Sequence, residues 1–499
     1  MRLFPMNAGQ TRARMVQAGA VLLAVALAAG CGSAYRPVVT PIGTNLPAAQ
    51  VQSYAVVVSS PSPTTPGIVT IIDYSGDTVL DEVPIGPGPS AFTIDEYAAN
   101  GYTVNSDGTL SNFTISTTLQ AKEVTYSTLS SAAESAPPHR PVNLFSPSAG
   151  MWAADLVGSF TDYFQGYPQD FKVAVPVAIT PVTIIGPASV GQYDYAISQN
   201  IANPTGVECN ISPRTVAVNG VADAIGTSTY TVSASIPLGK CPVYAAQSSD
   251  NRRLFVLNRG DDTISVINNQ TNTLDFCTPF QNQNGQTVTC HPSLPLSTSA
   301  GLPQNAGATV PAVAGPVYAE YNAATSQLIV ADYDGNTISV IDVSMDEYGN
   351  DSATFGTTFT IPVGNNPASV TVLADGSRAY TANQTDQTVT IVNLNSHTVE
   401  KTLPVIGHPR TVVSTQNSSF GKVYVASPDS PYLTILRTDL DIVDTTILVE
   451  GNIVDVRATT QTGTQGNNID VSRVPGYGEP CYLPGAAAQA TLAVCQTLP

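Results

Sequence analysis

The chain has 499 residues with 37 acidic and 19 basic side chains, which gives a formal net charge of -18. Charged residues make up only 11% of the chain, and the basic ones form no stripe along it. This balance argues against nucleic acid as a partner, because phosphate contacts need clustered Lys and Arg, and an anionic membrane surface would repel so acidic a protein.

The N-terminal segment has the pattern of an export signal. Arg2, Arg12 and Arg14 precede an uncharged run over 15–30, which ends in Leu-Ala-Ala-Gly directly before Cys31. A basic region, an apolar region and a small-residue cleavage site predict a signal peptide over residues 1–30. The segment resembles a bacterial lipoprotein signal, which implies that Cys31 carries a lipid and becomes the first residue of the mature chain. Ordinary secretion, with Cys31 merely nearby, is the alternative.

The stretch after this cysteine is predicted to be a tether. Residues 31–50 are rich in Pro, Thr and Ala without strand periodicity, as in a flexible linker between lipid and folded domain. Because Gly32 rather than Asp follows Cys31, the resemblance implies an outer-membrane location in a Gram-negative cell envelope.

A pair of prolines five positions apart recurs along the rest of the chain. The six pairs are Pro84/Pro89, Pro176/Pro181, Pro237/Pro242, Pro311/Pro316, Pro362/Pro367 and Pro404/Pro409. The first step, 92 residues, is about twice the shortest, 42 residues, which predicts a degenerate junction at 137–142. A further junction at 448–453 brings the repeat to eight units, and such periods are typical of propellers and solenoids.

Each unit reads as four short strands. Segments 256–268, 330–342 and 381–393 align without gaps, and each has a β-branched run, an Asn/Asp/Gly turn and a run that alternates with period two. These are hairpins, and one further strand lies on each side of every proline pair. We therefore expect an all-β fold, a β-propeller of four-stranded blades over 51–468. Eight blades are expected, with seven as the alternative, and Ile453 to Arg457 should pair with Tyr54 to Ser59 to close the ring.

Four tetrads within these hairpins resemble the YVTN-type repeat β-propeller family. They lie at 255–258 (FVLN), 329–332 (IVAD), 380–383 (YTAN) and 424–427 (YVAS), each followed by a strand similar to TVSVID. The resemblance is strong over about 241–449. It implies a propeller, and some propellers that look related are lactonases or lyases.

Six cysteines remain after Cys31, an even number that suggests disulfides in an exported chain. Fifteen pairings are possible, and proximity in the sequence favours Cys209 with Cys241, Cys277 with Cys290, and Cys481 with Cys495. The middle pair lies in an insertion over 275–308 that interrupts the repeat. The spacing of these cysteines matches no metal site. Residues 469–499 are expected to form a C-terminal extension.

Candidate ligand-binding residues lie on the connections between blades, which gather around the mouth of a propeller's central channel. They are His139, Arg140, Lys240, His408 and Arg410. Cations that converge there would suit an anionic or carbonyl-bearing ligand, and ordinary exposed loop residues are the alternative.

The sequence contains no serine-hydrolase elbow, phosphate loop, dinucleotide fingerprint or H-E-x-x-H motif, so it predicts no catalytic residue, cofactor or metal. The function predicted is that of a membrane-anchored envelope lipoprotein, a monomer whose propeller is a non-catalytic scaffold that binds or displays protein, peptide or glycan. The alternative is a lactonase- or lyase-like enzyme with its site at the channel mouth.

Overall fold

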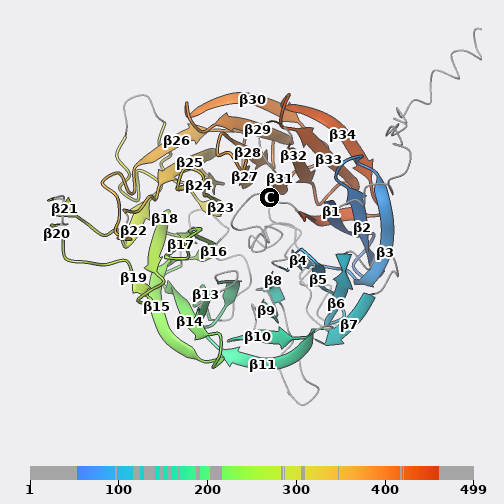
Figure 1. Ribbon diagram of the computed structural model, residues 1–499, viewed down its shortest axis with the longest axis horizontal. Coiled ribbons are helices and arrows are strands. Elements are labelled where there is room, and N and C mark those ends of the chain that lie inside the picture. Colours follow the sequence, from blue (N-terminus) through green and yellow to red (C-terminus); the bar gives the residue numbers. More distant parts are fainter. Residues whose placement is uncertain are drawn as a thin grey trace, which may run out of the picture. The chain divides into compact units, whose positions relative to one another are not determined.

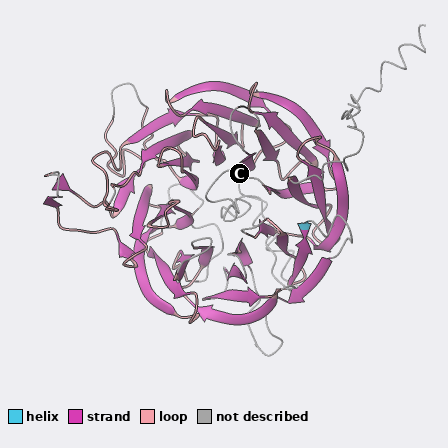
Figure 2. Ribbon diagram, viewed as in Figure 1, coloured by secondary structure: helices cyan, strands magenta, loops and turns pink. Residues whose placement is uncertain are grey.

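The computed structural model describes residues 53–459, apart from gaps at 96–97, 116–123, 129–140, 147–149, 156–158, 167–168, 187–191, 203–208, 210–215, 282–284, 286, 305–308, 347, 416–418 and 420. It is an all-β protein with eight blades of four antiparallel strands arranged in a ring (Figures 1 and 2). The predicted eight-bladed propeller is confirmed. Within the described residues, none of the helical structure is long and apolar enough to cross a membrane.

Each blade has its first strand at the centre of the ring and its fourth at the rim (Figure 1). From the centre outwards, the first four blades are blade 1, β35 (Asn452–Ala458), β1 (Tyr54–Ser60), β2 (Pro66–Asp73) and β3 (Val79–Pro87); blade 2, β4 (Ala91–Ile94), β5 (Asn100–Val104), β6 (Thr109–Thr114) and β7 (Val124–Thr128); blade 3, β8 (Pro141–Phe145), β9 (Gly150–Asp155), β10 (Phe160–Gln165) and β11 (Asp170–Pro176); and blade 4, β12 (Pro181–Ile185), β13 (Tyr193–Ser198), β14 (Asn219–Gly226) and β15 (Val232–Lys240).

The other four are blade 5, β16 (Pro242–Gln247), β17 (Arg253–Asn258), β18 (Thr263–Asn268) and β19 (Thr273–Leu274), with β22 (Ser293–Pro295) also paired to β18; blade 6, β23 (Pro316–Asn322), β24 (Gln327–Asp332), β25 (Thr337–Asp342) and β26 (Thr358–Pro362); blade 7, β27 (Pro367–Val372), β28 (Arg378–Asn383), β29 (Thr388–Asn393) and β30 (Thr398–Pro404); and blade 8, β31 (Thr411–Thr415), β32 (Lys422–Ala426), β33 (Tyr432–Arg437) and β34 (Ile442–Leu448). A separate two-stranded hairpin joins β20 (Phe280–Gln281) to β21 (Thr287–Val288).

Every predicted junction lies at the change from an outermost strand to the next innermost one, although Pro84 and Pro237 themselves lie inside β3 and β15. Proline begins the innermost strand in blades 3 to 7, including Pro141 at the degenerate junction. A strand can begin with proline because no ladder hydrogen bond is lost there. The repeat of proline pairs is therefore the repeat of blade boundaries.

The two ends of the described chain complete one blade. β35 pairs with β1 in the register Val456↔Val57 and Ala458↔Ala55, and the Tyr54 N–H donates to the Thr459 hydroxyl at 2.8 Å. This closure confirms the predicted pairing. It covers the inner edge of β1, which would otherwise be open to other strands.

A polar residue at the end of the second strand holds the turn of several blades. Asn258 Nδ2 donates to Ser265 Oγ at 2.9 Å, and Asn383 Nδ2 donates to Thr390 Oγ1 at 2.8 Å. A Cβ on Gly364, in the junction before blade 7, would lie 2.7 Å from the Asn383 side chain. The glycine of the Ile-Pro-Val-Gly end thus leaves room for the asparagine of the following blade.

The core lies between neighbouring blades, where their sheets pack face to face. Trp152 of blade 3 is fully buried in a cluster with Ile184, Ala196 and Ile225 of blade 4. Its indole N–H donates to Asp194 Oδ2 at 2.8 Å. The single tryptophan therefore fills the space between two blades.

Candidate functional site

The predicted channel-mouth cations lie on connections of different blades. Lys240 ends β15 before blade 5, whereas His408 and Arg410 lie between β30 and β31, before blade 8. Blades 5, 6 and 7 separate the two connections along the ring. His139 and Arg140 lie outside the described residues. The structure therefore brings His408 and Arg410 into one connection and leaves Lys240 in another.

Lys240 and Arg410 have contacts that fix the fold. The Lys240 backbone N–H donates to Asp261 Oδ2 at 2.5 Å, which ties the junction to the turn of blade 5. The Arg410 side chain is buried, and its Nη2 donates to the carbonyl of Val454 on β35 at 3.2 Å. Arg410 thereby connects blade 8 to the closing strand of blade 1.

His408 is the most exposed of the three, with 48% of its side chain accessible. Its Nδ1 lies 2.6 Å from Asp429 Oδ2, and its Nε2 lies 3.2 Å from Gln387 Nε2. Burial acts to raise the pKa of Asp429, but hydrogen bonds from the side chain and backbone of His408 outweigh it and lower that pKa. Both ring nitrogens of His408 therefore have a partner within the protein, as expected of a residue with a structural role.

A second region stands out because it interrupts a strand. β19 pairs with Ile267 and Asn268 at one end of β18, and β22 pairs with residues 263–265 at the other end. Between them, the Asp275 N–H donates to the Val266 carbonyl at 2.8 Å, and the Val266 N–H donates to the Pro292 carbonyl at 3.0 Å. The fourth strand of blade 5 is therefore one ladder in two pieces. Residues 276–291, which we call the arm, leave it and return at adjacent positions.

The arm is pinned at its base and carries a short hairpin. Cys277 and Cys290 form a disulfide with their Cα atoms 5.5 Å apart. Beyond it, β20 and β21 pair through Phe280↔Val288 and Gln281↔Thr287, and they project outwards from the ring (Figure 1). The predicted pairing is confirmed, as is that of Cys209 with Cys241. Cys481 and Cys495 lie outside the described residues.

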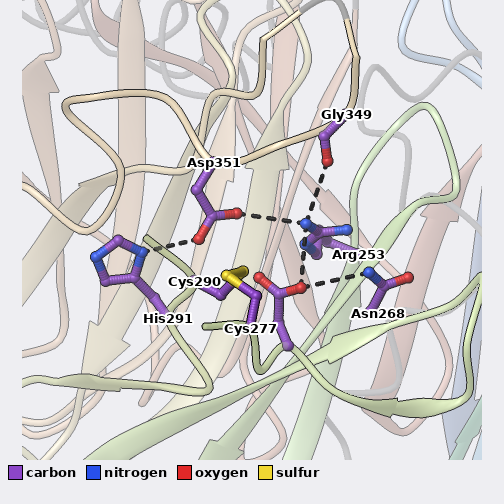
Figure 3. The surroundings of a disulfide bond; sticks show 8 residues. Arg253, Asn268, Cys277, Cys290, His291, Gly349 and Asp351 are labelled. Carbon is purple, nitrogen blue, oxygen red and sulfur yellow. Dashed lines mark hydrogen bonds and ion pairs between the residues drawn. A yellow bond between two sulfur atoms is a disulfide. The ribbon is translucent and has the colours of Figure 1, made fainter. Parts of the chain in front are cut away.

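A buried arginine organises the base of the arm (Figure 3). Arg253 of β17 has a side chain only 3% exposed, and its Nη2 lies 3.2 Å from Asp275 Oδ1 and 3.4 Å from Asp351 Oδ1. The same nitrogen donates to the Gly349 carbonyl at 3.3 Å. Burial and the neighbouring Asp351 carboxylate raise the pKa of Asp275, and Arg253 opposes them. One cation thus joins the start of the arm to a loop of blade 6.

The other end of the arm is tied to the same loop. His291 Nδ1 lies 2.8 Å from Asp351 Oδ2, on the side of the carboxylate away from Arg253 (Figure 3). The His291 ring also stacks on Phe355, with centroids 5.2 Å apart. Both ends of the arm are therefore fixed to blade 6.

Sequence reasoning did not identify Arg253, Asp275, Asp351 or His291 as a group. Arg253 lies in β17, Asp275 directly precedes the arm, His291 ends the arm, and Asp351 lies in the connection between β25 and β26. No spacing or motif links these positions, so only the folded ring brings them together. The insertion itself was visible as an irregular step in the proline repeat.

The outer surface of the arm is aromatic and polar. Phe276 is 82% exposed and Phe280 is 43% exposed, and Tyr348, beside Gly349 in the blade 6 loop, is 56% exposed. Gln281 Nε2 donates to Thr287 Oγ1 at 2.6 Å. Within the described residues, no group of three or more His, Cys, Asp or Glu side chains could hold a metal ion.

Comparisons with known proteins agree with the fold. No protein-family model and no curated protein matches the chain. Among solved structures, Citrobacter koseri AztD aligns with a TM-score of 0.52 at 12% identity, over 81% of this chain and 97% of that one. Dihydro-heme d1 dehydrogenase NirN in complex with DHE aligns with a TM-score of 0.53 at 12% identity, over 83% and 78%. At such identities the likeness extends to the propeller fold alone.

Proposed function

We propose that this protein is a membrane-anchored envelope lipoprotein of the YVTN-repeat type, whose propeller is a non-catalytic scaffold that presents the arm to a binding partner. One observation carries the proposal. The arm leaves the fourth strand of blade 5 through a disulfide and a buried ion-pair network, yet Phe276 at its base and Phe280 beyond the disulfide are both exposed. Four tetrads at the second strand of blades 5 to 8 support the repeat type.

The construction of the arm favours binding over a purely structural role. A disulfide across a loop of this length contributes roughly 3 kcal/mol in the chain-entropy model. The blade 5 sheet is already complete without the residues beyond Cys277 and Cys290. The constraint therefore serves to preorganise the arm, and preorganisation raises affinity because less conformational entropy is lost on binding.

The disulfides also support the proposed location. Cys209–Cys241 and Cys277–Cys290 both have geometry for a covalent bond, and such bonds persist in oxidising compartments outside the cytosol. Lipidation of Cys31, followed by a tether over 31–50, would hold the propeller close to a membrane. The large negative charge then keeps the domain soluble on its tether.

Site-specific photo-crosslinking in intact cells tests the scaffold role. A benzoylphenylalanine at position 276 is expected to give a discrete adduct, because that side chain points into solvent on the arm. The matched control is position 448, where Leu448 of β34 is 59% exposed outside the arm. Equal labelling from both positions, or none from 276, would reject the arm as the contact surface.

A further inference from the structure

The arm differs from the rest of the protein in its charge. Residues 276–290 contain no Asp, Glu, Lys or Arg, in a chain whose formal net charge is -18. At its base, the side chains of Arg253, Asp275 and Asp351 are at most 3% exposed and form ion pairs. The neighbouring Arg252 side chain is 38% exposed, lies against Gly349 and is 3.8 Å from Asp250. Residues 276–290 of the arm therefore present an uncharged surface, which cannot select a partner by charge.

The exposed groups on this surface are of two kinds. Phe276 and Phe280 offer aromatic faces, which are large, rigid and apolar. Gln281, Thr287 and Thr289 are also exposed, and an amide or hydroxyl can both donate and accept hydrogen bonds. A ligand that matches both kinds has apolar faces and many hydroxyl groups but no charge.

Size argues against a folded protein as the occupant. A stable protein interface takes about 800 Å² and roughly 20–30 residues on each side, and the arm spans only residues 276–291. A peptide that adds as a strand needs a longer edge than β20 or β21 offers, since each has two residues and strand addition depends on main-chain hydrogen bonds along the edge.

We infer that the arm binds a neutral glycan chain. The C–H face of a pyranose ring packs on Phe276 or Phe280, and the sugar hydroxyls exchange hydrogen bonds with the Gln281 amide and the threonine hydroxyls. This inference rests on the proposed scaffold function and names its ligand class. The disulfide and the Arg253 network hold the two phenylalanines at a fixed base, so little ordering is needed on binding.

The test is a titration of the purified full-length protein, in detergent, with defined hexasaccharides. The neutral probes are maltohexaose, cellohexaose, chitohexaose and mannohexaose, and a hexauronate is the charged comparison. At least one neutral probe is expected to bind with an affinity that changes less than about twofold between roughly 50 and 500 mM NaCl, because no ion pair is involved. Binding of the hexauronate alone would overturn the inference.

Substitutions then place the ligand on the arm. Phe276→Ala is expected to weaken binding at least tenfold and Phe280→Ala several-fold, whereas Leu448→Ala, on an exposed site of blade 8, leaves it unchanged. Equal melting temperatures check that the variants are folded. Binding that survives both phenylalanine changes, or no binding to any neutral probe, would overturn the inference. If position 276 nevertheless crosslinks to a protein in cells, the scaffold role stands and only the glycan class fails.

Discussion

Replacing Asp332 by Asn should stabilise the propeller at neutral pH. Asp332 ends β24 with 0% exposure and accepts hydrogen bonds from Ser339 Oγ at 2.7 Å and Thr337 Oγ1 at 3.1 Å. Blades 5 and 7 have Asn258 and Asn383 at this position. Burial raises the pKa of Asp332 from 3.8 to about 8, although the two hydrogen bonds oppose it. At neutral pH this carboxyl group is therefore protonated and uncharged, like the asparagine side chains at the equivalent positions.

The sign and size of the effect follow from this raised pKa. Between pH 3.8 and about 8 the unfolded chain loses the proton that folded Asp332 keeps, so stability falls as pH rises through this window. Each pH unit lowers the free energy of unfolding by about 1.4 kcal/mol. The wild type is therefore less stable by roughly 4 kcal/mol at pH 7 than at pH 4. Asn cannot ionise, so Asp332→Asn should match the wild type near pH 4 and exceed it by up to about 4 kcal/mol at pH 7.

Urea unfolding between pH 4 and 8, followed by the fluorescence of Trp152, measures this difference. The mirror-image control is Asn383→Asp, which places a carboxyl at the buried, equivalent position of blade 7 and should introduce a loss of stability with rising pH. A gap between Asp332→Asn and wild type that stays constant with pH, or a variant less stable at pH 7, would refute the assignment of the cost to desolvation of this carboxyl.

Three further changes test the closure, the arm and the anchor. Arg457→Leu removes the cation 2.8 Å from the buried Asp455 and should cost about 3–5 kcal/mol in thermal unfolding, whereas changing both residues to Leu should recover much of the loss. The Cys277→Ser/Cys290→Ser variant should be cut by chymotrypsin at the arm much faster than wild type, because a constraint of roughly 3 kcal/mol is lost. Cys31→Ala should move the protein from the membrane fraction to the soluble fraction.

Each of these changes has an outcome that contradicts its reasoning. If the double variant at 455 and 457 is as unstable as Arg457→Leu, the loss of stability does not come from leaving the Asp455 carboxylate buried without its cation. Unchanged cleavage without the disulfide would show that the Arg253 network alone fixes the arm. An unchanged membrane fraction for Cys31→Ala would reject the lipid anchor.

Local sequence patterns predicted most of the fold. Proline cannot donate to a ladder, so the proline pairs occur at or near strand ends, and their spacing gives the blade boundaries even at Pro141. Asn/Asp turns and period-two runs gave the hairpins, because these preferences act within a few residues. The closing strand followed from a count of the predicted strands. Blade 1 lacked an innermost strand, and the strand from Ile453 to Arg457 was assigned to no other blade.

The candidate site could be predicted only in part. Cys277 and Cys290 are close in the sequence, so their pairing was the simplest of those possible. The channel-mouth residues were chosen for their charge, and charge alone does not reveal that Arg410 is buried against Val454 or that Gln387 contacts the His408 ring. Those contacts depend on the neighbouring blade.

By itself the sequence determined the repeat and the pairing that closes the ring, and it favoured eight blades over seven, because these follow from short-range backbone preferences copied along the chain. The tertiary structure alone decided that the insertion splits the fourth strand of blade 5, and that Arg253, Asp275 and Asp351 meet at its base. Arg253 and Asp351 are 98 residues apart in the sequence. Only the packing of blade 5 against blade 6 brings their side chains together and excludes water from them.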